Sequence, residues 1–151
     1  MNESMPVAPA LVAAILSMLA AQALKPFWVL MVERHLDWRR AFDTGGMPSS
    51  HTSLVTTLTI AVGAQEGVQS SMFAVALVFS GYFVFEATGL RQEVGHQARV
   101  LNEMIEEFVS DHAMHVDARR LRELVGHTWS EVLGGVVVGV LVFFACRPWW
   151  S

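Results

Sequence analysis

The chain has 151 residues, the length of one domain, and 53% of them are hydrophobic while only 16% are charged. Soluble domains carry about 25% charged residues, so the composition favours an integral membrane protein. The net charge of −4 gives no reason to expect a nucleic-acid partner. The lone Cys146 excludes an internal disulfide and a multi-cysteine metal site. We therefore expect one membrane-embedded domain over residues 1–151.

Four segments are candidates for membrane-spanning helices. Residues 7–24 carry no charge, and residues 72–90 and 129–146 carry a single charge each. Each of these can cross a hydrocarbon core of about 30 Å. Residues 52–68 are interleaved with Thr and Ser, which suits a helix that packs against other helices rather than lipid. The sequence predicts an all-α membrane bundle with about four spans.

The basic residues predict an orientation in the membrane. With four spans, the connections at 25–50 and 90–128 lie on one side and hold nine of the ten Lys and Arg residues, while Arg147 lies on the other. Basic residues in short loops are retained in the cytoplasm. We therefore expect both connections on the cytoplasmic side of a bacterial-type inner (plasma) membrane. The residues before the first span contain an acid and no Lys or Arg, so we expect this span to be structural rather than a cleaved signal peptide.

The two long connections also carry helical patterns. Apolar residues recur at helical spacing between residues 94 and 108, which is typical of an amphipathic helix on the bundle or membrane surface. Pro26 would start or kink a second such helix over residues 27–38. Residues 110–118 have no periodicity, so we interpret their His and Asp residues as a polar loop rather than metal ligands.

The first polar cluster reads GGMPSSH over residues 45–51, directly before the second span. Paired glycines permit backbone angles closed to other residues, and proline suits the first turn of a helix. The helix start would present unpaired amides and the Ser49 and Ser50 hydroxyls as an anion site, with His51 in the first turn. The alternative is a glycine–proline turn with serine caps and no ligand.

The second cluster reads GHTWSE over residues 126–131, at the start of the fourth span. His127 and Glu131 are four residues apart and so share a helix face. The carboxylate can accept one imidazole N–H and leave the other nitrogen as a nucleophile or base. The alternative is an interfacial pair beside Trp129, which would anchor the helix at the headgroup level.

The third cluster reads EATGLR over residues 86–91, at the end of the third span. Glu86 falls within the apolar run, where an ionisable group is costly and usually faces a partner or a watery cavity. Arg91 is one candidate partner. A structural ion pair is the alternative to a functional role.

All three clusters fall on one side of the predicted bundle, together with Lys25 at the end of the first span. Two histidines, two carboxylates and several cations can therefore converge on one pocket. For a dianionic phosphate, cations and helix-start amides would supply an electrostatic clamp, while one histidine attacks and another protonates the leaving oxygen.

At this point the sequence resembles the divergent branch of the type 2 phosphatidic acid phosphatase superfamily, which also includes the vanadium haloperoxidases. The resemblance covers nearly the whole chain. It rests on LK at 24–25, GGMPSSH at 45–51, EATGLR at 86–91, ARVLN at 98–102 and ELVGHTWSEVLGG at 123–135.

The resemblance implies a role for each matching residue. Three would hold the phosphate: Lys25, Ser49 and Ser50. His51 would protonate the leaving group. His127 would be the nucleophile that forms a phosphohistidine, and Glu131, which stands where the broader pattern has Asp, would orient it.

The chain also departs from the broader pattern. No Arg-Pro follows Lys25 at the expected distance, and Leu121 holds the place of the arginine in the third motif. Pro-Ser-Ser-His replaces Pro-Ser-Gly-His. Two arginines are candidates for the missing charge: Arg91 and Arg122. Glu86 stands where the divergent branch usually has Asp, so it is a candidate site residue as well.

The sequence thus predicts an integral membrane phosphatase that acts on a lipid phosphate monoester at the cytoplasmic leaflet and requires no metal. Phosphatidylglycerophosphate, phosphatidic acid and polyprenyl phosphate are the expected substrates. Two alternatives stay open: a lipid phosphotransferase, and a non-catalytic protein that binds lipid headgroups. Gly134, Gly135 and Gly139 would allow close helix approach, and could seat a neighbouring helix or a second subunit of a homo-oligomer.

Overall fold

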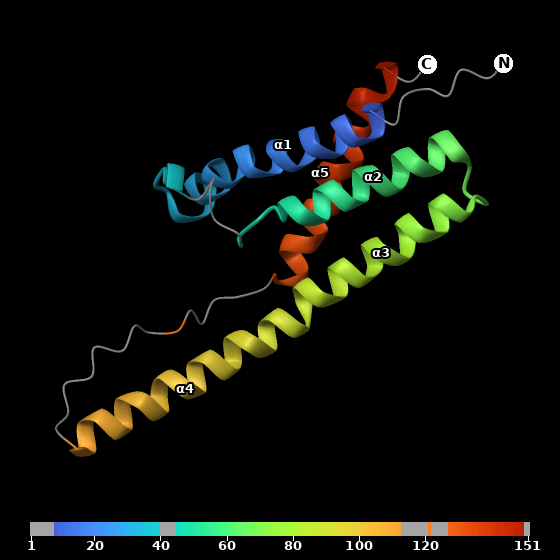
Figure 1. The fold of residues 1–151 in the computed structure, drawn as a ribbon. Coiled ribbons are helices and arrows are strands. Elements are labelled where there is room, and N and C mark those ends of the chain that lie inside the picture. The colour runs from blue at the N-terminus through green and yellow to red at the C-terminus, as the bar shows by residue number, and fades with distance from the viewer. Residues whose placement is uncertain (1–7, 40–44, 113–120, 122–126, 150–151) are drawn as a thin grey trace.

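The computed structural model describes residues 8–39, 45–112, 121 and 127–149, and these residues form helices without any strand. The helices are α1 (Ala8–Glu33), α2 (Ser50–Glu66), α3 (Ser71–Thr88), α4 (Leu90–His112), α5 (Trp129–Cys146) and the short 3-10 helix η2 (Arg147–Trp149). The predicted all-α fold is confirmed. Figure 1 shows α1, α2, α3 and α5 gathered into one bundle, with α4 extending away from it.

Three helical stretches of the described chain are long and apolar enough to cross a membrane. They are Pro9–Glu33, Ser71–Val109 and Trp129–Cys146. The protein is therefore a helical membrane bundle. Whether α2 also crosses the bilayer, as the four-span interpretation requires, stays a prediction.

Helix α1 runs without interruption through Pro26, which lies inside it and is fully buried. The prediction of a separate amphipathic helix over residues 27–38 is therefore wrong. Proline removes one intrahelical hydrogen bond, but in an apolar environment the remaining bonds keep the helix intact. The helix ends instead at Glu33, because the next residue, Arg34, has a left-handed φ of 58° that cannot continue an α-helix.

Helix α2 packs against α1, α3 and α5 and carries most of the buried hydroxyls of the bundle. Thr57 donates to the Gly139 carbonyl of α5 over 2.9 Å, and Thr59 lies 2.7 Å from the Ser80 hydroxyl of α3. The Ser53 hydroxyl contacts that of Ser17 in α1. Hydroxyls that bond across helices hold apolar bundles together without any hydrophobic driving force. The Thr and Ser content of α2 thus serves helix packing, as the sequence predicted.

Close contact between α5 and α2 depends on two glycines of α5. A Cβ on Gly135 would lie 2.5 Å from the Ser49 carbonyl oxygen, and one on Gly139 would lie 2.8 Å from the Ser53 carbonyl oxygen. Both distances are too short for real Cβ contacts. The expectation that these glycines allow close helix approach is confirmed, and the helix that they seat is α2.

Helix α4 continues the course of α3, because the Gly89 amide donates to the Phe85 carbonyl and the Gly89 carbonyl accepts from Glu93. The helix predicted between residues 94 and 108 is confirmed. However, α4 extends beyond the bundle instead of folding back onto it (Figure 1). Halfway along α4, the Asn102 side chain holds both backbone groups of Leu121, at 3.0 and 2.9 Å.

The glycine contact gives a test of the packing. Gly139→Ala should lower the stability of the bundle by about 1–3 kcal/mol, because the added methyl overpacks the contact with α2. Gly81→Ala in α3 is the matched control, since a Cβ there meets nothing within 4 Å. Thermal unfolding in detergent, followed by tryptophan fluorescence, measures both variants. Equal melting temperatures for the two variants would contradict this account of the α2–α5 contact.

Candidate active site

The start of α5 is fixed by a reciprocal capping box. The Thr128 hydroxyl accepts a hydrogen bond from the Glu131 amide, and a Glu131 carboxylate oxygen accepts one from the Thr128 amide, both at 3.4 Å. The sequence T-x-x-E ahead of an apolar run is the ordinary signal for this cap. Glu131 is thereby held at one position relative to the helix axis.

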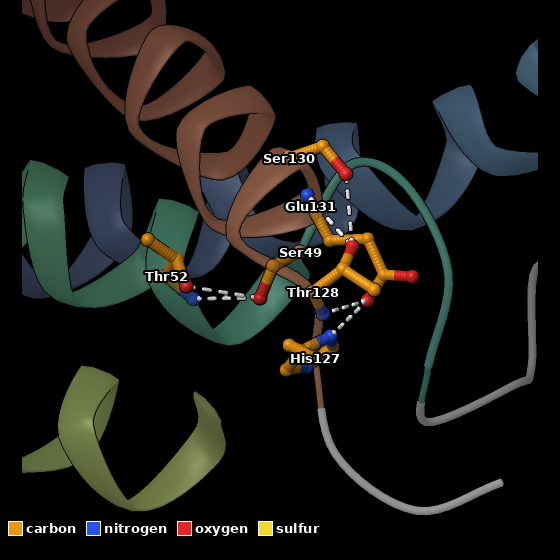
Figure 2. Close-up of polar contacts among 6 residues, drawn as sticks. All are labelled: Ser49, Thr52, His127, Thr128, Ser130 and Glu131. Carbon is orange, nitrogen blue, oxygen red and sulfur yellow. Dashed lines mark hydrogen bonds and ion pairs between the residues drawn. The ribbon is translucent and has the colours of Figure 1, made fainter. Parts of the chain in front are cut away.

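The same carboxylate orients His127. Its Oε2 lies 2.7 Å from Nδ1 of His127, whose side chain is almost fully buried (Figure 2). The His127 amide donates to the Ala87 carbonyl of α3 over 2.9 Å. An imidazole that gives its Nδ1 proton to a carboxylate carries its lone pair on Nε2. The predicted pairing of His127 with Glu131 is therefore present, in the geometry of an oriented nucleophile.

His51 lies beside this pair, in the first turn of α2. Its ring centroid is 6.3 Å from that of His127 and 6.1 Å from that of Phe83 in α3. The Ser49 amide donates to the Glu131 carbonyl over 3.0 Å, which ties the start of α2 to the start of α5. The structure thus brings together the two predicted histidines and the predicted carboxylate, although they come from distant parts of the sequence.

The two serines before His51 are buried. The Ser49 hydroxyl accepts from the amide and the hydroxyl of Thr52, at 3.3 and 3.0 Å, and so caps α2 (Figure 2). Ser50 is 2% exposed in the first turn of that helix. The interpretation of Ser49 as a helix cap is therefore confirmed, and the predicted contact of Ser49 and Ser50 with phosphate stays a prediction.

Lys25 is 2% exposed and lies at a cavity of about 510 Å³ beside the same end of the bundle. The cavity is bounded by the second half of α1, the glycine turn and the start of α5. Its lining residues are Lys25, Trp28, Val29, Val32, Glu33, Gly45, Gly46, Met47, Thr128, Ser130 and Glu131. Neither His51 nor His127 lines this cavity. Glu131 links the two regions, because it lines the cavity and also holds His127.

The remaining predicted residues are less closely placed. Glu86 lies at the end of α3, next to the Ala87 carbonyl that binds His127. The backbone of Arg91 lies in the first turn of α4, and Arg122 lies outside the described residues.

Two contacts of the site were missed at the sequence level. Thr128 caps the helix that carries Glu131, and its capping-box signal was present in the sequence. Phe83 packs against His51 from α3. No local signal predicts that contact, because it joins two helices through their packing.

The fold and the site define the class of protein: it is a helical membrane bundle in which a carboxylate holds one histidine and a second histidine lies beside it. The sequence model of the Divergent PAP2 family matches residues 7–142, and the chain belongs to this family. The resemblance stated from the motifs is confirmed. The chain is also 36% identical over 141 residues to the uncharacterized membrane protein YuiD of Bacillus subtilis (strain 168), covering 87% of this chain and 89% of that protein. No solved structure gives a significant match.

Proposed function

We propose that the protein is an integral membrane phosphatase that hydrolyses a lipid phosphate monoester through a phosphohistidine on His127. Membership of the Divergent PAP2 family supports phosphate chemistry, and the apolar helices support a lipid substrate. The observation that carries the proposal is the 2.7 Å contact between His127 and Glu131, with His51 beside it. A protein that only captures lipid headgroups needs cations but has no need of an oriented nucleophile.

In the first step, Nε2 of His127 attacks phosphorus and the bond between phosphorus and the lipid oxygen breaks. His51, protonated at the start, gives its proton to the departing oxygen, so that the lipid leaves as an alcohol. Glu131 stabilises the positive charge that develops on His127. The products of this step are the free lipid alcohol and a phosphorylated enzyme.

In the second step, neutral His51 accepts a proton from water, which attacks the phosphoryl group. The bond between phosphorus and Nε2 breaks, inorganic phosphate leaves, and both histidines return to their starting states. Splitting the hydrolysis in this way replaces one difficult displacement by two easier ones. Lys25, together with Arg91 or Arg122, supplies the cations that we propose to neutralise the transferring group, and we propose that Glu86 orients one of them.

The substrates that fit this chemistry are phosphatidic acid, phosphatidylglycerophosphate and polyprenyl phosphates. In each, the hydrocarbon can stay in the bilayer while the phosphate enters the polar end of the bundle. If an alcohol replaced water in the second step, the same site would act as a phosphotransferase.

The histidine roles are tested with detergent-purified protein and lipid phosphates. His127→Ala should abolish phosphate release, because no nucleophile remains. In the first turnover, His51→Ala should slow the release of a poor leaving group, such as a lipid alcohol, by about 100-fold, but slow the release of p-nitrophenol from p-nitrophenyl phosphate far less, because nitrophenolate needs no proton to leave. His96→Ala, on the exposed surface of α4, is the control.

The two histidine variants give separate outcomes. A folded His127→Ala protein that releases phosphate at the wild-type rate would overturn the nucleophile assignment. Equal losses for both leaving groups in the first turnover of His51→Ala would overturn the role of His51 as the acid.

We further propose that the site faces the cytoplasm. Nine of the ten basic residues fall in the connections 25–50 and 90–128, which lie on the same side of the proposed four-span bundle as the site. The test uses single cysteines in a Cys146→Ser background. Leu36→Cys follows the end of α1, three residues after Glu33 of the Lys25 cavity, and Val68→Cys lies in the turn between α2 and α3; both positions are exposed. A membrane-impermeant thiol reagent should label Leu36→Cys only in inverted vesicles and Val68→Cys in intact cells.

Labelling of both cysteines from the same side would show that α2 does not cross the membrane. Labelling of Leu36→Cys in intact cells would place the site outside the cytoplasm. Either result would contradict the proposed topology.

A further inference from the structure

His51 contacts an aromatic side chain of α3, Phe83, which has no role in the proposed reaction. The Phe83 ring lies 6.1 Å from the His51 ring, centroid to centroid, with the planes inclined by 36°. Phe79, one turn earlier in α3, lies 5.9 Å from Phe83. Phe83 is partly buried, whereas Phe79 is 57% exposed. The two rings form a continuous apolar path from His51 to the outer surface of α3.

The outer surface of α3 is apolar and faces away from the other helices. Within the bundle α3 packs on α2, along one edge (Figure 1). Its exposed large side chains are Met72, Val75, Leu77, Val78, Phe79, Tyr82 and Phe85. In a helix that crosses the membrane, such a surface contacts lipid chains. The path formed by Phe79 and Phe83 therefore joins the hydrocarbon region of the bilayer to His51.

The proposed reaction places the leaving group of the substrate next to His51. In the proposed reaction His51 gives its proton to the leaving oxygen, so the carbon chain attached to that oxygen begins next to the His51 ring. Phe83 is the apolar group that meets a chain starting there. The cavity at Lys25, in contrast, is not lined by either histidine.

We propose that Phe83 and Phe79 receive the hydrocarbon of the leaving alcohol and make the enzyme selective for long-chain lipid phosphates that enter from the α3 side. This inference rests on the proposed function. It favours substrates whose hydrocarbon starts within a few bonds of the phosphate monoester, such as phosphatidic acid or a polyprenyl phosphate. Phosphatidylglycerophosphate, with a polar phosphoglycerol between the two parts, would use this path poorly.

The test compares two phosphatidic acids with the same headgroup, one with dioleoyl and one with dibutyryl chains, in the same detergent. Phe83→Ala should lower kcat/KM for the dioleoyl lipid by about tenfold and for the dibutyryl lipid by less than about threefold, because the four-carbon chains make fewer apolar contacts with the two rings than the long chains do. Phe79→Ala should also lower the ratio of kcat/KM for the dioleoyl lipid to kcat/KM for the dibutyryl lipid, but by a smaller factor. Partition of each lipid into detergent is common to all variants and cancels in the comparison.

Phe85→Ala is the matched control, because Phe85 belongs to the same helix and is 71% exposed. It should leave the ratio between the two lipids unchanged. Phe83→Leu keeps an apolar side chain and should retain most of the preference for the long chain. If Phe83→Ala does not fold, the exposed Phe79→Ala still gives the comparison, and an unchanged ratio in Phe79→Ala would overturn the inference.

The outcomes separate this inference from the function on which it rests. If wild type hydrolyses both lipids and Phe83→Ala lowers both rates equally, Phe83 only supports the His51 ring and the inference is wrong while the proposed function stands. If wild type releases no phosphate from either phosphatidic acid, from a polyprenyl phosphate or from phosphatidylglycerophosphate, the proposed function fails, and the inference fails with it.

Discussion

The Glu131 carboxylate is the group on which the arrangement of this site depends. One of its oxygens accepts from the Thr128 amide, which starts α5, and lies 2.7 Å from Nδ1 of His127. The carboxylate that helps to cap α5 therefore also orients the imidazole. Two backbone hydrogen bonds, from His127 to Ala87 and from Ser49 to Glu131, fasten α3 and the start of α2 to this point. Three helix ends thus meet at residues 127–131.

The bundle keeps these helix ends in register through α2. Its hydroxyls bond to the other helices, and Gly135 and Gly139 let its backbone approach α5 closely. Polar side chains are costly in a membrane unless they are bonded, so each of these contacts also specifies which helix lies against α2. The Ser49 cap and the Gly135 contact lie one turn from His51. At this end of the bundle, the same residues therefore pack the helices together and position the site.

Local spacing in the sequence was enough to predict the pairs that lie on one helix. His127 and Glu131, four residues apart, bond as expected, and the GGMPSSH turn leads into a capped helix. Pro26 misled the prediction of α1, because the apolar surroundings preserve a helix that proline would end in water. The contact of Phe83 with His51 could not be predicted, since it depends on how α2 and α3 pack.

The central claim, that His127 is a nucleophile oriented by Glu131, is tested most directly by mapping the covalent intermediate. The purified protein is mixed with a lipid phosphate, quenched in alkali, which preserves phosphohistidine, and digested for mass spectrometry. The account predicts one phosphoryl group on His127, formed at least as fast as phosphate is released. Turnover without a phosphoryl group on His127, or with the group on another residue, would contradict it.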